Sequence, residues 1–591
     1  MIEVDEEIVG SEIGAGSEYF HVQLEAVESL SQSSCTHVLP YANPATRILQ
    51  FLSSPGLLRI SAVWEVRRHN EEYKYRSRTW YWLIERSMEY PTVLYILAVI
   101  AISLIWRNIF LASPLSHFPG PLLAKWTRFY RFYYDVVVGG GWLSQLEHLH
   151  EVYGPVVRVG PKELHFADPA AYADIYSSPA KLPKDLELYK VFRFGLPPNL
   201  FTEDDPKAHA VIKSRLVSFF SRQAILKLEH VIQEQIDRLI SQLIKNHKNT
   251  PANMHSAFRS VTLDIITQYV FRTNPDTTTY PSFEHPALRD LDERISTKWI
   301  FKHFPILVQV TNSLPTWLAS LVVPGSAPQL ATLELVSKLV DDALEQTQAE
   351  GPAEYDSKDR NVFYTIIRNA REKDQLEHQV TREYLICEGL DFRIAGTETV
   401  SNACYVGARC LIRDDEVRGK LTAELDKAWP DRDALMPLER LEKLPYLTAV
   451  IKESLRLSHG AVTPMTRIVP DSGATIIGHS VPPGTVVSTG NTFVHLNADI
   501  FPEPNQFHPE RWTEAKDHSL DKYLVTFGKG PRSCLAINLG WSELYLILGN
   551  VFRKLELKSV SDLGSGLRFR EFFEAIWEGD PLSVTVTERQ S

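Results

Sequence analysis

Apolar residues recur with helical spacing along most of the chain that follows residue 141. Long amphipathic stretches predict helices near 206–245, 252–271, 326–350, 378–412, 414–429 and 442–457. A further helix is predicted over "GWLSQLEHLHEVYG" (141–154), which ends at a glycine. Strand-like alternation occurs over "PVVRVGPKELHFADP" (155–169), bent at Gly160-Pro161 into a hairpin, and over 462–494, with turns at 471–473 and 482–484. The pattern therefore predicts a mainly α fold with minor β.

One segment before this region has a different character. The stretch "PTVLYILAVIAISLIW" (91–106) carries no charge and is bordered by Tyr90 and Arg107. It is slightly shorter than the roughly 20 residues of a membrane-spanning helix. We predict a transmembrane anchor over 88–112, with a buried core helix as the alternative. A proline-containing linker is predicted over 113–140, and a single large domain over 141–591, where no second linker occurs.

Residues 1–87 show no clear periodicity or motif, and their role is unknown. If translation began at Met88, basic residues such as Lys125 and Arg128 would lie only on the carboxyl side of the anchor. The positive-inside rule would then place the large domain in the cytosol. With the extension kept, Lys74 and Arg76 help to balance the count, and the orientation stays open. The hypothesis is that 1–87 is an extended gene model or a dispensable extension.

Composition and charge exclude several classes of protein. The 591 residues are 44% hydrophobic and 23% charged, which is ordinary for a globular protein. The net charge of −11, without a basic stripe, argues against nucleic-acid binding. No CxxC pair occurs among Cys35, Cys387, Cys404, Cys410 and Cys534, which argues against a zinc site or a disulfide framework and favours a reducing compartment.

The last of these cysteines lies in an unusual frame, "FGKGPRSCLAINLG" (527–540). Gly528 and Gly530 allow a tight turn and a close approach to a flat partner. Cys534 precedes an apolar run that predicts a helix, whose amino-terminal amides would stabilise a thiolate. Arg532 could pair with a carboxylate on whatever the sulfur binds. A buried core cysteine and a nucleophile with a distant base are the alternatives.

This frame resembles the haem-binding loop of the cytochrome P-450 superfamily, Phe-x-x-Gly-x-Arg-x-Cys-x-Gly. Ala536 replaces the final glycine. The resemblance implies that the Cys534 thiolate is the axial ligand of the iron of haem b. It also implies a cofactor-binding role for the rest of the loop, namely Phe527, Gly528, Gly530 and Arg532.

Two motifs upstream resemble the structural network of the same family. In "KESLRL", Glu453 and Arg456 are three residues apart and share one helix face, so an ion pair is natural there. Alone this spacing is a weak signal, because most such pairs lie on a solvated surface. In "FHPERW", Arg511 resembles the arginine that completes the network. By resemblance the three side chains brace the haem loop and perform no chemistry.

A third motif, "AGTET" (395–399), lies inside a predicted long helix and resembles the oxygen-activation motif. Gly396 weakens the helix, and the Thr399 hydroxyl can bond a mid-helix carbonyl, so a groove could open there. Glu398 and Thr399 would form the acid–alcohol pair that delivers protons during oxygen activation. A surface helix position is the alternative. All four motifs follow the order of the family.

Further cofactor contacts are implied more weakly. In "AHAVIKSRL", His209 and Lys213 have the spacing of residues that contact a haem propionate, although Lys lacks the bidentate geometry of Arg. In "TPMTRIVP", Arg467 stands where a strand arginine of the family meets a propionate. Each of the three could instead be an exposed cation.

The resemblance covers about 115–591 and implies the cytochrome P-450 fold and a haem-thiolate monooxygenase. Such an enzyme inserts one oxygen atom from O2 into an apolar small molecule. Because the chain has no GxGxxG fingerprint and no flavin domain, electrons would come from NADPH–cytochrome P-450 reductase. The expected location is the endoplasmic reticulum membrane, single-pass, with contact to lipid and the catalytic domain in the cytosol. The alternatives are a haem-thiolate isomerase or dehydratase without a reductase, a non-catalytic haem sensor or electron carrier, and a haem-free cysteine hydrolase.

The stretches "HFPGPLLAKW" and "FGLPPNLFTEDDPKAHA" are similar to fungal secondary-metabolism members of the trichodiene-oxygenase-like group. This similarity implies a substrate of terpenoid or polyketide origin. By family position, the pocket is expected at 183–205, Asp391, Phe392, Ala395, Val462, Thr463 and Phe573. The carboxylate of Asp391 would be unfavourable in an apolar pocket unless it is paired. Arg393 could instead face outward and leave Asp391 toward another helix.

Overall fold

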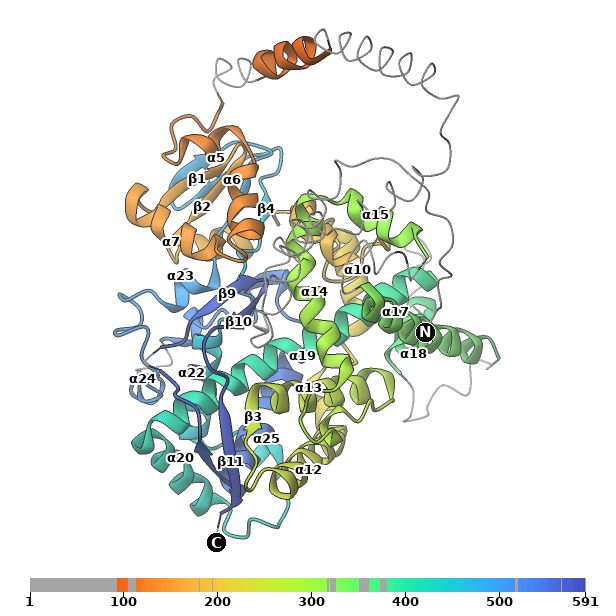
Figure 1. The fold of residues 1–591 in the computed structure, drawn as a ribbon, viewed down its shortest axis with the longest axis vertical. Coiled ribbons are helices and arrows are strands. Elements are labelled where there is room, and N and C mark those ends of the chain that lie inside the picture. Colours follow the sequence, from red (N-terminus) through yellow and green to blue (C-terminus); the bar gives the residue numbers. More distant parts are fainter. Residues whose placement is uncertain are drawn as a thin grey trace, which may run out of the picture. The chain divides into compact units, whose positions relative to one another are not determined.

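The computed structural model describes residues 93–104 and 113–589, apart from 180, 194, 316–317, 319–325, 350–360, 373–379, 516–518 and 565 (Figure 1). Helices follow one another along most of this part of the chain. Besides a helix over 93–104, they are α5 (Leu122–Trp126), α6 (Phe129–Phe132), α7 (Trp142–Tyr153), α8 (Ala171–Tyr176), α9 (Leu186–Tyr189), α10 (Pro206–Leu216), α11 (Arg222–Lys227), α12 (Glu229–Asn246), α13 (Met254–Phe271), α14 (Pro286–His303), α15 (Ile306–Ser313), α17 (Ser326–Ala349), α18 (Val362–Glu372), α19 (Arg382–Arg413), α20 (Asp415–Ala428), α21 (Leu438–Leu441), α22 (Pro445–Ser458), α23 (Asn491–His495), α24 (Glu510–Glu514) and α25 (Ile537–Lys554).

The strands are short and pair across long stretches of sequence. They are β1 (Val156–Gly160), β2 (Glu163–Phe166), β3 (Ala252–Asn253), β4 (Arg467–Ile468), β5 (Ala474–Ile476), β6 (His479–Val481), β7 (Val486–Ser488), β8 (Leu555–Ser559), β9 (Phe569–Phe572), β10 (Glu574–Trp577) and β11 (Ser583–Glu588). One sheet has the order β1-β2-β7-β4, with β2 and β7 parallel. A second has the order β3-β11-β8, and β5-β6 and β9-β10 form two separate pairs.

The prediction of a mainly helical fold with minor β is confirmed. The hairpin at Gly160-Pro161 is the antiparallel pair β1–β2, and the stretch near 206–245 divides into α10, α11 and α12. The longer helices α14 and α18 were not predicted, nor were several shorter ones such as α8 and α15, nor the strands β8 to β11. Among these strands, β11 pairs with both β3 and β8, and β9 pairs with β10.

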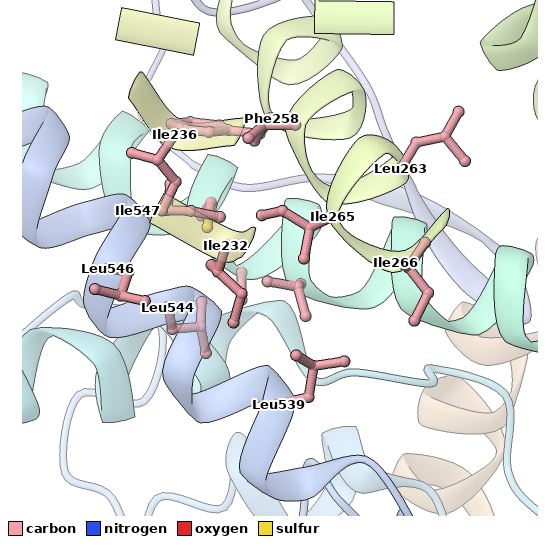
Figure 2. Close-up of a cluster of buried hydrophobic side chains, with 14 of the residues drawn as sticks. Ile232, Ile236, Phe258, Leu263, Ile265, Ile266, Leu539, Leu544, Leu546 and Ile547 are labelled. Atoms are coloured by element: carbon pink, nitrogen blue, oxygen red, sulfur yellow. The ribbon is translucent and has the colours of Figure 1, made fainter. Parts of the chain in front are cut away.

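A core of aliphatic side chains joins α12, α13 and α25. Figure 2 shows Ile232 and Ile236 of α12 together with Phe258 of α13 and Ile547 of α25, and all four are fully buried. Because α25 begins three residues after Cys534, this core fixes the helix that follows the cysteine loop. Burial of side chains of this size stabilises the fold by about 1.5–3 kcal/mol each.

The long helix α19 packs closely against α13. A Cβ atom at Gly396 would overlap the side chain of Ile266 on α13, so glycine permits the close approach of the two helices. Helix α19 continues from Arg382 to Arg413 without a break at this position. The helix is thus uninterrupted at Gly396, where packing against α13 supports the backbone, and the expected weakening by glycine stays a prediction.

The predicted anchor is only partly covered by the structure. Of 88–112, the described residues are the helix over 93–104, whose apolar side chains such as Leu94 and Leu97 are exposed. None of the helices within the described residues has the length and apolar character that a membrane span requires. The extension 1–87 lies outside the described residues.

Shortening a side chain in the shared core should destabilise the protein in proportion to the volume removed. Ile236→Val should lower the free energy of unfolding by about 0.5–1.5 kcal/mol and Ile236→Ala by about 2–5 kcal/mol. Urea unfolding followed by circular dichroism measures both. The control is Leu335→Ala on α17, a side chain that is 47% exposed and whose loss should change stability by less than about 0.5 kcal/mol. Equal effects at both positions would contradict this assignment of the core.

Candidate active site

The loop around Cys534 is held in a tight conformation that requires glycine. Gly528 and Gly530 have φ values of +69° and +73°, and a Cβ atom at Gly530 would overlap the backbone oxygen of Tyr176. The amide of Cys534 donates a hydrogen bond of 2.8 Å to the Phe527 oxygen and closes the loop. The two glycines therefore stand where the sequence predicted a tight turn.

The Cys534 side chain faces a cavity of about 300 Å³. Ala395 and Thr399 of α19 line the same cavity, together with Phe527 and Leu539. Burial within the protein raises the pKa of the Cys534 thiol, while the Ala536 amide and the Lys213 ammonium oppose that rise. The thiol is thus exposed to an internal space rather than to bulk solvent.

Several cations line this cavity without a carboxylate partner. Lys184, Arg467 and Arg532 form no ion pair anywhere in the part of the chain that the structure describes. Burial and the charge of Arg467 lower the pKa of Arg532 to about 10. Burial and the charges of Arg532 and Lys184 lower the pKa of His209 to about 3. The positive charges of Lys184, Arg467 and Arg532 repel one another, and a bound anion would reduce this repulsion.

Backbone and phenol oxygens hold the cations in place. Arg532 donates to the carbonyl oxygens of Glu203 and Asp204, the second at 2.8 Å. Arg467 donates to the Tyr189 hydroxyl at 2.6 Å. Lys213 also lines the cavity, so its expected contact with a haem carboxylate stays a prediction. Its ammonium group donates to the Pro531 oxygen at 2.8 Å, and so it holds the cysteine loop itself.

The predicted network around Glu453 is present and fully buried. Arg456 donates two hydrogen bonds of 2.8 Å to the Glu453 carboxylate, one to each oxygen, and Arg511 donates one of 3.0 Å. The Trp512 indole and the His508 amide donate to the same carboxylate at 2.9 Å. These donors hold the pKa of Glu453 below its usual value although burial alone would raise it.

A relay of hydrogen bonds connects this network with the cysteine loop. Arg456 donates to the His495 backbone oxygen at 2.8 Å, and the His495 ring accepts from the Val525 amide at 3.0 Å. Thr526 donates to the Leu455 oxygen of α22 at 2.9 Å. Sequence reasoning missed His495, since a lone histidine carries no motif. The relay supplies a physical route by which the network can position the loop.

Thr399 lies on the cavity wall, and its hydroxyl donates to the Ala395 oxygen at 2.9 Å, as predicted for a mid-helix carbonyl. Glu398 does not line the cavity. Its carboxylate is buried between α19 and α13, where Arg259 donates to it at 2.7 Å. Nothing in the sequence linked Arg259 to Glu398, because the two residues are 139 positions apart. In this conformation the Glu398 carboxylate points away from the cavity that Thr399 lines, so the expected acid–alcohol pair is not formed.

Some of the residues predicted to form the pocket line the cavity, and others do not. Phe392, Asp391 and Phe573 line the cavity, as does Phe201 from the stretch 183–205. Val462 and Thr463 do not: Val462 packs in a separate apolar cluster, and Thr463 donates to the Glu571 carboxylate. Their neighbours Ala461 and Met465 line the cavity instead. The sequence prediction therefore chose the wrong residues within 461–465 as those that face the cavity.

The sequence over residues 119–570 matches the family model described as "Cytochrome P450". This match covers well over half of the chain and includes all four motifs. The chain belongs to the cytochrome P-450 superfamily. The prediction of a haem-thiolate monooxygenase of this superfamily is thereby supported at the level of the family, and the comparisons with individual proteins extend it.

Among three curated relatives of this cytochrome P-450, two are named monooxygenases and the third is named a synthase. "Cytochrome P450 monooxygenase MO6277" of Ascocoryne sarcoides is 33% identical over 465 residues, which are 77% of this chain and 89% of the relative. "Cytochrome P450 monooxygenase flvC" of Aspergillus flavus is 31% identical over 524 residues, 82% of this chain and 94% of the relative. "Conidiogenone synthase PchP450" of Penicillium rubens is 32% identical over 453 residues, 75% and 88% respectively. Membership and monooxygenase chemistry are confirmed by this agreement.

The residues of the cavity fit the haem that this superfamily binds. A thiol faces the space, and a glycine-containing loop leaves room beside it. The unpaired cations Arg467 and Arg532, with His209, match the two carboxylates of a haem. The chemistry of the donor set is therefore that of a haem-thiolate site, with Lys213 placed to support the loop.

Removing the charge of Glu453 should be far more harmful than removing that of an exposed glutamate. Glu453→Gln would leave Arg456 and Arg511 buried without a counter-charge, which costs about 3–5 kcal/mol, and the loop should lose its haem. Urea unfolding and the ratio of Soret to protein absorbance measure the two effects. The matched control is Glu442→Gln, which breaks the exposed pair with Arg222 and should cost at most about 1 kcal/mol. A normal haem content in Glu453→Gln would contradict the bracing role.

Proposed function

We propose that this cytochrome P-450 monooxygenase uses haem b, with Cys534 as the axial ligand, to insert one oxygen atom from O2 into an apolar small molecule. The observation that carries the proposal is the convergence of the Cys534 thiol and the unpaired cations on one cavity. The same cavity has an apolar wall in which Phe201, Phe392 and Phe573 take part. Thiolate ligation of haem iron increases electron density on the metal and favours O–O cleavage.

The chain's own residues would bind, orient and supply protons. Arg467, Arg532 and His209 would hold the haem carboxylates, and the apolar wall would exclude water from the reacting carbon. The Thr399 hydroxyl donates its hydrogen bond to the Ala395 oxygen. Its lone pairs are therefore available to accept a hydrogen bond from a water molecule that delivers a proton. Thr399 would thus orient the last proton donor toward the cavity.

Glu398 would join this proton path only after a side-chain movement. Its carboxylate is held by Arg259 through two donors, Nε at 3.1 Å and Nη2 at 2.7 Å. A rotation that releases one of these contacts would bring the carboxylate toward Thr399 on the next helix position. Until then Glu398 stabilises the α13–α19 contact, and the proton reaches Thr399 through water alone.

The remaining features of the proposal concern location, partners and substrate. A separate NADPH–cytochrome P-450 reductase would supply electrons, and the segment 88–112 would attach the enzyme to the endoplasmic reticulum membrane. The segment 113–140, whose Leu115 and Phe118 pack in an apolar cluster of the domain, would lead from this anchor into 141–591. Extension 1–87 would be absent from the native protein or dispensable. The relative named conidiogenone synthase and the trichodiene-oxygenase-like stretches favour a substrate from fungal secondary metabolism, of terpenoid or polyketide origin.

The proposal is tested first by the reduced, carbon-monoxide difference spectrum of membranes that express the chain. We expect a strongly red-shifted Soret band that Cys534→Ala loses. The control is Cys410→Ala, which removes a free cysteine of α19 that is buried away from the cavity and should leave the band unchanged. Absence of haem absorbance in well-folded protein would overturn the proposal.

Thr399→Ala should separate electron consumption from product formation. With any accepted substrate, product yield should fall by about 10²-fold or more while NADPH oxidation continues and hydrogen peroxide accumulates. The matched control is Thr397→Ala. That hydroxyl makes the same kind of bond, to the Arg393 oxygen at 2.7 Å, but it is buried and does not line the cavity. An unchanged product-to-NADPH ratio in Thr399→Ala would contradict the proton-path role.

A further inference from the structure

One polar side chain of the cavity is not used by the proposed chemistry. Asp391 lies on α19, and it lines the cavity together with Ala395 and Thr399. These residues recur every fourth position, so they share one face of the helix. At a rise of 1.5 Å per residue, Asp391 lies about 12 Å along the axis from Thr399. Asp391 is therefore remote from Thr399, the end of the cavity at which the proposed function places the oxidised carbon.

Asp391 has no hydrogen-bond or ion-pair partner within the described residues. The nearest cations are already engaged. Lys184 donates to the Phe201 oxygen and lies over the rings of Tyr189 and Phe201, at 4.8 and 4.9 Å. Lys298 forms an ion pair of 2.9 Å with Glu574. A carboxylate left in this position is unfavourable unless a ligand supplies a donor.

Two charged neighbours of Asp391 on α19, Glu388 and Arg393, have hydrogen-bond partners in the protein. Glu388, one turn earlier, accepts a hydrogen bond of 2.8 Å from the Leu200 amide and so holds the loop that borders the cavity. Arg393 contacts Thr332 of α17 and the Ala287 oxygen of α14, away from the cavity. The possibility that Asp391 would turn to another helix is thus not realised. It is the cavity that Asp391 faces.

We propose that Asp391 binds a hydroxyl group of the substrate and thereby sets which end of the molecule reaches the haem. The inference rests on the proposed function and specifies its substrate: an apolar skeleton that already carries a hydroxyl group at the end opposite the oxidised carbon. The apolar wall near Asp391, which includes Phe201, Phe392 and Phe573, suits the skeleton. The carboxylate is the acceptor that the hydroxyl would otherwise find in water.

The electrostatic setting agrees with this role. Burial, assisted by the charge of Glu574 and opposed by those of Lys184 and Lys298, raises the pKa of Asp391 to about 7. Glu388 on the same helix also faces Asp391 electrostatically, and its own pKa is raised to about 8. An ionised carboxylate accepts a stronger hydrogen bond than a neutral acid. Binding of a hydroxyl-bearing ligand should therefore tighten as the pH rises through about 7.

The test uses matched pairs of probes on the haem-loaded, full-length enzyme: cedrol beside cedrane, hexahydrofarnesol beside farnesane, and dodecanol beside dodecane. Substrate-type Soret shifts and equilibrium dialysis both measure the dissociation constants. Wild type should bind at least one alcohol about tenfold or more tightly than its hydrocarbon. Asp391→Leu should remove this preference, and its hydrocarbon binding should be retained or improved. Asp391→Asn, which keeps the shape and one acceptor, should fall between.

The control is Glu388→Gln, whose carboxylate already has a backbone partner and does not line the cavity, so the preference for alcohols should persist. Ligand-free Asp391→Leu should also unfold at a higher temperature than wild type at neutral pH. The reason is that a carboxyl whose pKa is raised on folding destabilises the folded state wherever it is ionised. A purely structural aspartate would show the opposite shift.

The proposal fails if wild type binds the hydrocarbons as tightly as the alcohols, if it binds none of the probes, or if Asp391→Leu keeps the preference for alcohols. A carbon-monoxide band that remains intact in these experiments would assign the failure to Asp391 and leave the haem-thiolate function standing. A missing band would instead be a failure of the proposed function.

Discussion

The buried carboxylate of Glu453 is the constraint on which the geometry of the site depends. It accepts hydrogen bonds from two guanidinium groups, an indole and a backbone amide, and the side chains of Glu453, Arg456, Arg511 and Trp512 are all buried. Such an arrangement is favourable only when every donor is present. Through His495 and Thr526 the same network fixes the start of the cysteine loop. The position of the Cys534 thiol is therefore determined from outside the cavity.

Different faces of helix α19 have different roles. One face, with Asp391, Ala395 and Thr399, forms the wall of the cavity. Another carries Glu398 and packs on α13, where Gly396 allows close approach and Arg259 neutralises the carboxylate. Because a rigid helix carries both sets, the distance between the substrate-binding end and the proton-supplying end is fixed by helix geometry. A loop could not maintain this spacing.

Sequence reasoning recovered the parts of the site that depend on short, fixed spacings. The loop around Cys534 and the pair Glu453–Arg456 act through neighbouring residues, so their pattern is visible in one sequence. The partner of Glu398 was not recoverable, since Arg259 reaches it from a helix 139 residues away. Helix α14 escaped prediction because its polar and apolar residues are weakly segregated, and it depends on buried contacts such as the Lys298–Glu574 pair. Strands β8 to β11 are short, and β8 and β11 pair with each other across the intervening hairpin of β9 and β10.

The loop that borders the cavity is fastened at successive points. Asn199 donates to the Cys387 oxygen, the Leu200 amide donates to Glu388, and the carbonyls of Glu203 and Asp204 receive the Arg532 guanidinium. Opening the wall here would break contacts to α19 and to the cysteine loop together. Exchange of ligand past 199–204 would therefore have to break these contacts, each worth about 0.5–1.5 kcal/mol, whereas another stretch of the wall would not carry this cost. The route of entry, rather than the shape of the cavity alone, would then limit which molecules the enzyme oxidises.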